Sequence, residues 1–178
     1  ACLVGSEMCI RDRFIRYRFN GSCTSTFLTA LNDAITYWNN KFGYGILYNE
    51  GSYAGDPNYD LCIDDVPYAL ENNTLWDCGD DDSVKGPSAH AHALTWVKGF
   101  DNNKMLWVAE HVCGKSSSYL SYLFRHELGH IFSLADVSTC PSSNKPLMHN
   151  LYESTYCSNV LNADEWSTVQ GLSLIHIS

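Results

Sequence analysis

The stretch "RHELGHIFSLAD", residues 125–136, constrains the fold more than any other part of the chain. With the residues just before it, it carries the periodicity of an amphipathic helix. Phe124, Leu128 and Ile131 recur at the three-to-four spacing that forms one stripe of a helix. The spacing predicts a helix from about Tyr119 to Leu134 with this stripe against a core.

Two histidines four positions apart occupy another stripe of the same helix. One turn takes about 3.6 residues, so His126 and His130 project one above the other and can reach a single ion. Glu127 adjoins the first histidine, close enough to hydrogen-bond water at a metal without binding the metal. Two neutral imidazoles and an adjacent carboxylate base are typical of a zinc hydrolase. The alternative is an ordinary amphipathic helix with two surface histidines.

Both ends of the chain read as translated sequencing adapter. "LSLIHIS", residues 172–178, is what CTG TCT CTT ATA CAC ATC TCN encodes, the mosaic end of a transposase-based adapter. "LVGSEMCIRD", residues 3–12, reads as the same adapter family in the other orientation. Residues 1–13 and 172–178 are therefore predicted to be artefacts, and 14–171 to be one natural domain, truncated at its ends. Native termini at both ends would have to match by accident.

Trimming the ends changes the cysteine count. The eight cysteines lose Cys2 and Cys9, and no CxxC pair remains among the other six. An even set of this kind predicts a disulfide framework in a secreted, extracellular protein. The candidates are Cys23, Cys62, Cys78, Cys113, Cys140 and Cys157. Pairs Cys62–Cys78 and Cys140–Cys157 would each close a local loop; the alternative is six buried thiols in a cytosolic protein.

The chain is acidic, with a formal net charge of −9. Trimming removes Arg11 and Arg13 together with Glu7 and Asp12, so the charge is unchanged. Such a surface does not favour nucleic acid or anionic lipid, and no segment is long and apolar enough to span a membrane. We expect a monomer. The carboxylates of "CGDDD", residues 78–82, suit Ca²⁺, but their spacing is not that of an EF-hand loop, which favours a solvated acidic turn.

The other elements follow from shorter patterns. Residues 14–19, "FIRYRF", alternate as a half-buried strand does. A first helix begins at a cap among Thr24, Ser25 and Thr26 and ends at Gly43. Its apolar stripe is Phe27, Leu31, Ile35, Trp38 and Phe42. Further strands are predicted at Gly45–Tyr48, Tyr59–Ile63, Ala91–Val97 and Met105–Val112, and a last helix after Asn162 as cap.

"HELGHIFSLAD" followed by "PLMHN", residues 146–150, resembles the metzincin zinc metallopeptidases. His126, Glu127 and His130 match the family motif, and Asp136 stands at the place of its third ligand. Met148 matches the methionine of the Met-turn. The version with aspartate is similar to the snapalysins, and "LNADEWSTVQGL", residues 161–172, is similar to the closing helix of matrixins.

The resemblance implies an α+β, metzincin-like catalytic domain. Its parts would be a twisted mixed sheet of about five strands, the active-site helix, the Met-turn and a C-terminal helix. It implies an endopeptidase acting on a peptide or protein substrate, with one catalytic Zn²⁺ and Glu127 as general base. Met148 would form the apolar floor under the metal. The substrate would lie along an edge strand, Met105–His111, with contacts at Leu106, Trp107, Val108 and Ala109.

The sequence departs from the family at one position and offers one rival ligand. Ser133 stands where the family motif has glycine. A left-handed conformation there costs a non-glycine residue roughly 1–2 kcal/mol, so the turn, and with it the approach of Asp136 to the metal, is expected to differ from the family. The rival third ligand is Glu153, at the distance used by thermolysin-like gluzincins. It lies in the turn-rich stretch "HNLYESTYCSN", residues 149–159, which favours Asp136.

Other polar residues are weaker candidates. His90 and His92 alternate onto one strand face and suggest a second metal, but no further ligands accompany them. His111 and His149 read as ordinary polar residues. Tyr152 follows Met148 by four, whereas astacin-like and serralysin-like enzymes place a catalytic tyrosine two positions after the methionine, where this chain has Asn150. Two function classes remain, a secreted zinc endopeptidase and a non-catalytic secreted binding module that retains or mimics the zinc site.

Overall fold

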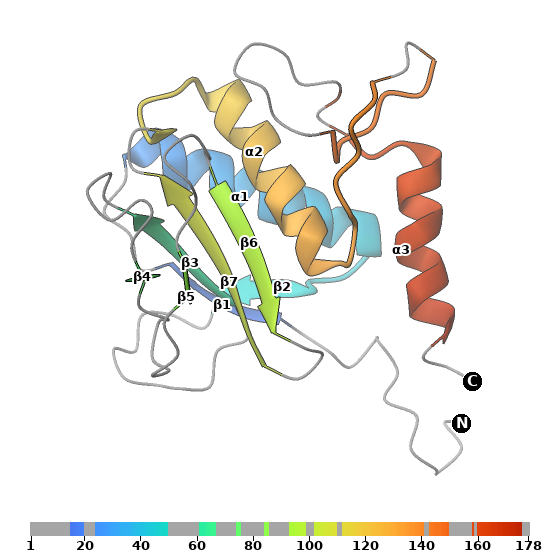
Figure 1. Ribbon diagram of the computed structural model, residues 1–178, viewed down its shortest axis with the longest axis horizontal. Helices are drawn as coiled ribbons and strands as arrows, with labels where there is room; N and C mark the ends of the chain where they lie inside the picture. The colour runs from blue at the N-terminus through green and yellow to red at the C-terminus, as the bar shows by residue number, and fades with distance from the viewer. Residues whose placement is uncertain are drawn as a thin grey trace.

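The chain folds as a mixture of helices and strands, with helices packed against a five-stranded sheet (Figure 1). The computed structural model describes residues 15–19, 24–49, 61–66, 74–75, 84–85, 93–98, 102–109, 112–140, 143–149, 158 and 160–175. Within these residues α1 packs against α2, and α2 packs against strands of the sheet. The predicted combination of α and β structure is confirmed at this level.

The five-stranded sheet has the order β2-β1-β3-β7-β6. Its strands are β1 (Ile15–Phe19), β2 (Leu47–Asn49), β3 (Leu61–Val66), β6 (Ala93–Lys98) and β7 (Asn102–Ala109). β2, β1, β3 and β7 pair in parallel, whereas β6 runs antiparallel to β7. The short strands β4 (Thr74–Leu75) and β5 (Val84–Lys85) form a separate antiparallel pair. The predicted strands are therefore found, with ends displaced by a few residues.

The prediction that Met105–His111 forms an edge strand is wrong. β7 contains Leu106, Trp107, Val108 and Ala109, but it pairs with β3 on one side and β6 on the other. Its backbone groups are thus committed to neighbouring strands. Local alternation of apolar residues cannot separate a central strand from an edge strand, because pairing is decided by segments far away in the sequence. Among the described strands, the edge on this side of the sheet is β6.

Helix α1 (Ser25–Phe42) matches the sequence prediction closely. Its N-cap is Thr24, whose hydroxyl accepts a hydrogen bond from the Phe27 backbone N–H. Gly43 ends the helix with φ of 75°, a left-handed conformation that glycine adopts without strain. The residues of the predicted apolar stripe face the core. Phe42 is partly buried, and the others are buried, namely Phe27, Leu31, Ile35 and Trp38.

Helix α2 (Ser117–Ile131) lies beside α1 and β6. Ser116 caps its N-terminus, and Phe132 ends it a little earlier than predicted. The predicted core stripe of this helix is buried, with Phe124 edge-on to Phe27 of α1 at 4.7 Å between ring centroids. Trp38 of α1 also donates a hydrogen bond of 3.1 Å to the Arg125 carbonyl. The two helices are therefore fixed to each other, which fixes the face of α2 that carries the histidines.

Helix α3 (Ala163–Ile175) begins with a reciprocal capping box. The Glu165 N–H donates to Asn162 Oδ1 at 2.9 Å, and the Asn162 N–H donates to Glu165 Oε2 at 2.9 Å. Asn162 is thus the cap that the sequence predicts. Trp166 packs edge-on against Phe42 at 5.6 Å, which joins α3 to α1. None of the described helices is long and apolar enough to cross a membrane.

Candidate metal centre

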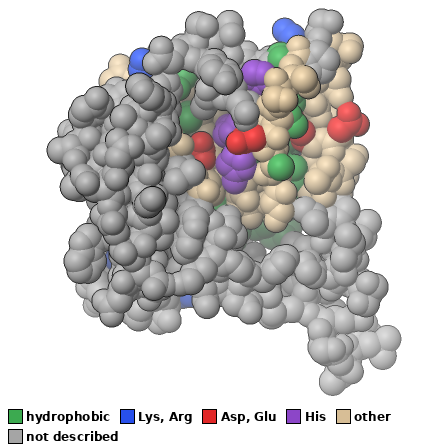
Figure 2. Space-filling view, in the orientation of Figure 1, with side chains coloured by type: hydrophobic (Ala, Val, Ile, Leu, Met, Phe, Trp, Pro, Cys, Tyr) green, Lys and Arg blue, Asp and Glu red, His purple; other side chains and the backbone are tan. Residues whose placement is uncertain are grey.

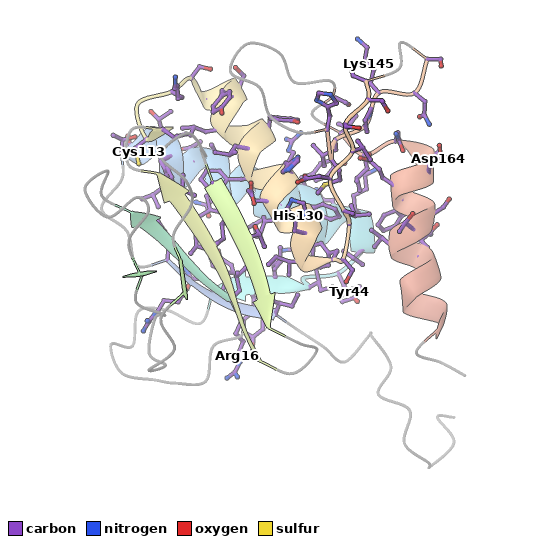
Figure 3. All side chains as sticks on the ribbon, in the orientation of Figure 1. Arg16, Tyr44, Cys113, His130, Lys145 and Asp164 are labelled. Atoms are coloured by element: carbon purple, nitrogen blue, oxygen red, sulfur yellow. The ribbon has the colours of Figure 1, made fainter. Side chains whose placement is uncertain are left out.

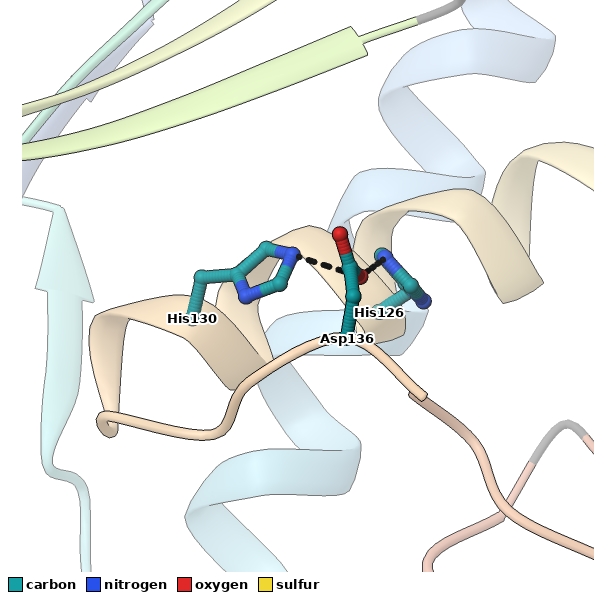
Figure 4. Close-up of side chains that lie close together, drawn as sticks. All are labelled: His126, His130 and Asp136. Carbon is teal, nitrogen blue, oxygen red and sulfur yellow. Dashed lines mark ion pairs between the residues drawn. The ribbon is translucent and has the colours of Figure 1, made fainter. Parts of the chain in front are cut away.

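His126, His130 and Asp136 lie together at the end of α2 (Figure 4). Their ligand atoms all lie within 4.8 Å of one another. His126 Nε2 is 3.1 Å from Asp136 Oδ1, and His130 Nε2 is 3.3 Å from the same oxygen. The structure therefore brings together the three residues that the sequence analysis selects as metal ligands.

Asp136 reaches the histidines because the chain reverses sharply after α2. The Ser133 N–H donates to the His130 carbonyl at 2.9 Å, and the Leu134 N–H donates to the Gly129 carbonyl at 3.2 Å. Ser133 itself has φ of 65°. The turn at Ser133 is thus left-handed although the residue is not glycine, and it brings Asp136 to the two histidines. The cost of this conformation is about 1–2 kcal/mol for a residue with a Cβ.

Backbone carbonyls hold both imidazoles in one tautomer. His126 Nδ1 lies 3.1 Å from the Leu147 carbonyl oxygen, and His130 Nδ1 lies 2.7 Å from the Leu134 carbonyl oxygen. A carbonyl oxygen only accepts, so each Nδ1 carries the proton and donates. In the neutral ring this leaves the Nε2 lone pair directed at the shared site, as metal-binding histidines require.

The donor spacing fits one small cation. Ligands that bind zinc tetrahedrally at about 2.0–2.1 Å lie roughly 3.3 Å from each other. The two Nε2–Oδ1 distances, 3.1 and 3.3 Å, agree with that spacing. Two imidazoles and one carboxylate also form a donor set that zinc accepts, with a further coordination position open.

Electrostatics at the site favour a positive charge. The imidazoles of His126 and then His130 hold the pKa of the Asp136 carboxyl well below its ordinary value, because each ring donates a hydrogen bond to it when Nε2 is also protonated. Burial alone would lower the pKa of His130, but the hydrogen bond to Asp136, the charge of Glu127 and the Leu134 carbonyl outweigh it, so this pKa is raised. The carboxylates thus attract a cation to the place between the two rings.

The site remains open to solvent on one side. The side chains of His130 and Asp136 are 21% and 52% exposed, whereas that of His126 is 5% exposed. Figure 2 shows histidine and acidic side chains lying next to each other at the surface on this face of the molecule. A ligand from solution can therefore reach the side chains of His130 and Asp136 without unfolding of the core.

Glu127 is buried beside the metal ligands and has a hydroxyl partner from the sheet. It is 5% exposed. Thr95 of β6 places its Oγ1 at 2.7 Å from Glu127 Oε2 and 3.0 Å from the Glu127 backbone carbonyl oxygen. Glu127 is predicted from the sequence but Thr95 is not, since nothing local to β6 indicates that this threonine meets a residue of α2.

Met148 packs directly against α2. It is 1% exposed. A Cβ added at Gly129, between the two histidines, would lie only 2.5 Å from the Met148 sulfur. The glycine therefore allows the methionine to approach the helix backbone. The Val137 N–H donates to the Met148 carbonyl at 2.8 Å, which ties the segment after Asp136 to the same turn.

Glu165 holds this turn from the other side. Its carboxylate accepts from the Leu147 N–H at 3.0 Å and the Met148 N–H at 2.7 Å, in addition to its capping bond. Figure 3 shows His130 on α2 and Asp164 at the first turn of α3, with the segment after α2 running between these helices. A chain of hydrogen bonds thus leads from Glu165 through Leu147 to His126. The capping box marks Glu165 in the sequence, but nothing there marks its bonds to the Leu147 and Met148 N–H groups.

The other predicted site residues divide between described and undescribed parts of the chain. Cys113 and Cys140 are disulfide-bonded. The His149 carbonyl accepts from the Tyr122 hydroxyl at 2.9 Å, and His149 is not part of the described metal cluster. Outside the described residues, or with undescribed side chains, lie Cys23, Cys62, Cys78, Cys157, residues 78–82, His90, His92, Trp107, Ala109, His111, Asn150, Tyr152 and Glu153. The predictions that fall on these residues are a second metal at His90 and His92, calcium at residues 78–82, a catalytic role for Tyr152 and Glu153 as the third ligand.

No protein-family model matches this chain, and no curated protein matches it.

Proposed function

We propose that this protein is a secreted zinc-dependent endopeptidase of the metzincin type. The observation that carries the proposal is the convergence of His126, His130 and Asp136 with Glu127 buried at their side. A carboxylate in this position can exchange a proton with water at the metal. The retained turn at Ser133 and the position of Met148 under α2 also fit the resemblance stated from the sequence.

Zinc would be held by the Nε2 atoms of His126 and His130 and by the Asp136 carboxylate. Bound there, it would supply a Lewis acid that acidifies water and polarises the scissile carbonyl. The protein would contribute by orienting the zinc ligands before the metal binds. The Leu147 and Leu134 carbonyls orient the two rings, so little rearrangement is needed on binding.

Glu127 would serve as the general base. One carboxylate oxygen would accept a proton from the attacking water and later give it to the leaving amine. Its burial favours this use, because few waters compete for the carboxylate. The hydrogen bond from Thr95 engages Oε2, and Oε1 is the second oxygen available for proton transfer.

The substrate would lie along β6 rather than β7. β6 is the outer strand of the described sheet on the side next to α2, and an outer strand offers backbone N–H and C=O groups to an extended peptide. Backbone pairing of this kind accepts many sequences, so one side-chain pocket would set selectivity. The disulfide-bonded Cys113 and Cys140 suit an extracellular location.

Casein zymography of the purified chain tests the proposal. We expect a zone of cleavage that disappears with a zinc chelator and returns when zinc is added back. A folded, zinc-loaded protein that gives no chelator-sensitive cleavage would support the non-catalytic binding module instead.

The matched variant for this assay is Glu127→Gln. The amide keeps the shape of the side chain but cannot accept the proton, so turnover is expected to fall by about 100-fold or more while zinc content is unchanged. Activity above about a tenth of the parent would contradict the role of Glu127 as base.

A further inference from the structure

Thr95 is a polar residue on the face of the sheet that meets α2. In the antiparallel pair of β6 and β7 it stands opposite Leu106, which is fully buried. Directly opposite residues share one face of a sheet, so Thr95 points to the same side as the core. β6 also packs against α2, and this brings the Thr95 hydroxyl to Glu127.

The hydroxyl of Thr95 has one proton and two acceptors within reach. Both belong to Glu127, the carboxylate Oε2 at 2.7 Å and the backbone carbonyl at 3.0 Å. The shorter contact has the length of a charge-assisted O–H···O⁻ bond, which is about twice as strong as a neutral one. The hydroxyl proton of Thr95 is therefore donated mainly to the carboxylate oxygen.

We propose that Thr95 is a positioning residue that fixes the carboxylate of Glu127 for catalysis. Held through Oε2, the side chain has one favoured orientation, and Oε1 is kept for exchange of a proton with water. A free glutamate side chain samples several rotamers. If the side chain were ordered only when the reaction occurs, the lost rotamer freedom would add about 1–2 kcal/mol to the barrier. The inference rests on the proposed peptidase function.

The location of Thr95 on β6 adds a second role for this contact. The strand proposed to pair with the substrate is also the strand that holds the base. The contact therefore joins the proposed base to the strand on which the substrate is proposed to lie. Loss of the hydroxyl should then affect turnover much more than substrate binding, because the backbone of β6 stays in place.

The experiment compares three variants of the full chain with the parent. Thr95→Val replaces the hydroxyl by a methyl of similar size, Thr95→Ser keeps it, and Thr29→Val is the control. Among the described residues, the Thr29 hydroxyl donates to the Ser25 carbonyl within α1 at 2.9 Å, far from Glu127 in the sequence. We expect kcat of Thr95→Val to fall about 10- to 100-fold with KM changed by less than about twofold. Thr95→Ser should recover most of kcat, and Thr29→Val should match the parent.

A readout independent of catalysis is a double-mutant cycle on unfolding of the metal-free protein. Thr95→Val is compared in the parent and in Glu127→Ala. The expected coupling is on the order of tenfold in the unfolding equilibrium constant, because Thr95→Val deprives the Glu127 carboxylate of its donor only in the parent background. Bound zinc, measured by atomic absorption, should be the same in parent and Thr95→Val.

The outcomes separate the two proposals. An active parent with an equally active Thr95→Val, or coupling below about twofold in the cycle, would overturn the role of Thr95 and leave the peptidase function intact. A zinc-loaded parent without peptidase activity would overturn both. A selective loss of kcat, rescued by serine and accompanied by coupling, would support the inference.

Discussion

Replacing Glu165 by alanine is expected to weaken both the fold and the metal centre, although Glu165 binds no metal. Its carboxylate accepts three backbone N–H groups, those of Leu147, Met148 and Asn162. Leu147 and Met148 are 0% and 1% exposed, so water cannot readily replace the lost acceptor at these two positions. The Asn162 N–H lies at a helix end that is only partly buried, and water can reach it.

The magnitude follows from these three bonds. Each buried donor left without an acceptor costs about 1–3 kcal/mol, and loss of the helix cap adds about 0.5–1 kcal/mol. For Glu165→Ala we therefore expect the free energy of unfolding to fall by about 2.5–7 kcal/mol. The effect should also reach the metal, because the Leu147 carbonyl orients His126. We expect zinc affinity to fall about 10- to 100-fold.

Urea unfolding followed by tryptophan fluorescence in the presence of a chelator measures the first effect. Competition with a chromogenic chelator, on protein that is still folded, measures the second. Asp164→Ala is the matched control, because its exposed carboxylate accepts one hydrogen bond, from the Asn144 side chain, and should contribute at most about 1 kcal/mol. If Glu165→Ala cost less than about 1 kcal/mol and zinc affinity were unchanged, the reasoning would be refuted.

Three further predictions address the ligands, the turn and the cysteines. Asp136→Ala should lose most of its zinc on dialysis against a mild chelator, whereas Glu153→Ala should retain about one equivalent by atomic absorption; the reverse result would move the third ligand to Glu153. Ser133→Gly should raise the free energy of unfolding of the metal-free protein by about 0.5–1 kcal/mol, since it relieves the left-handed strain at φ of 65° but adds freedom to the unfolded chain. A loss of stability would show that the Ser133 side chain makes contacts that outweigh the strain. Alkylation without reduction should label none of the six cysteines of residues 14–171 in mass spectrometry, and full labelling would contradict the secreted location.

The helices of this chain could be predicted from sequence because their signals are local. The cap of α1 at Thr24 and its end at Gly43 are defined by residues within one turn, and so is the cap of α3 at Asn162. The face shared by His126 and His130 follows from helix geometry alone. These features need no knowledge of what lies across the fold.

The order of the strands and two polar contacts could not be predicted, because they depend on distant segments. β7 pairs with β3 across a long stretch of sequence, and this pairing removes it from the edge. Thr95 meets Glu127 from 32 residues away, and Glu165 meets Met148 from 17 residues away. Asp136 was an intermediate case, since the resemblance supplied its role while the retained turn at Ser133 is a property of the folded chain.

The close approach of Gly129 and Met148 limits how this protein can change over generations. Alanine at position 129 would place its Cβ 2.5 Å from the methionine sulfur, although alanine favours a helix by about 1 kcal/mol over glycine. A smaller residue at 148 alone would leave a cavity under the histidines. Each substitution alone therefore destabilises the protein. When the two are made together, the volume added at position 129 fills the volume removed at position 148. Variation at these positions should be correlated, with a larger residue at 129 accompanied by a smaller one at 148.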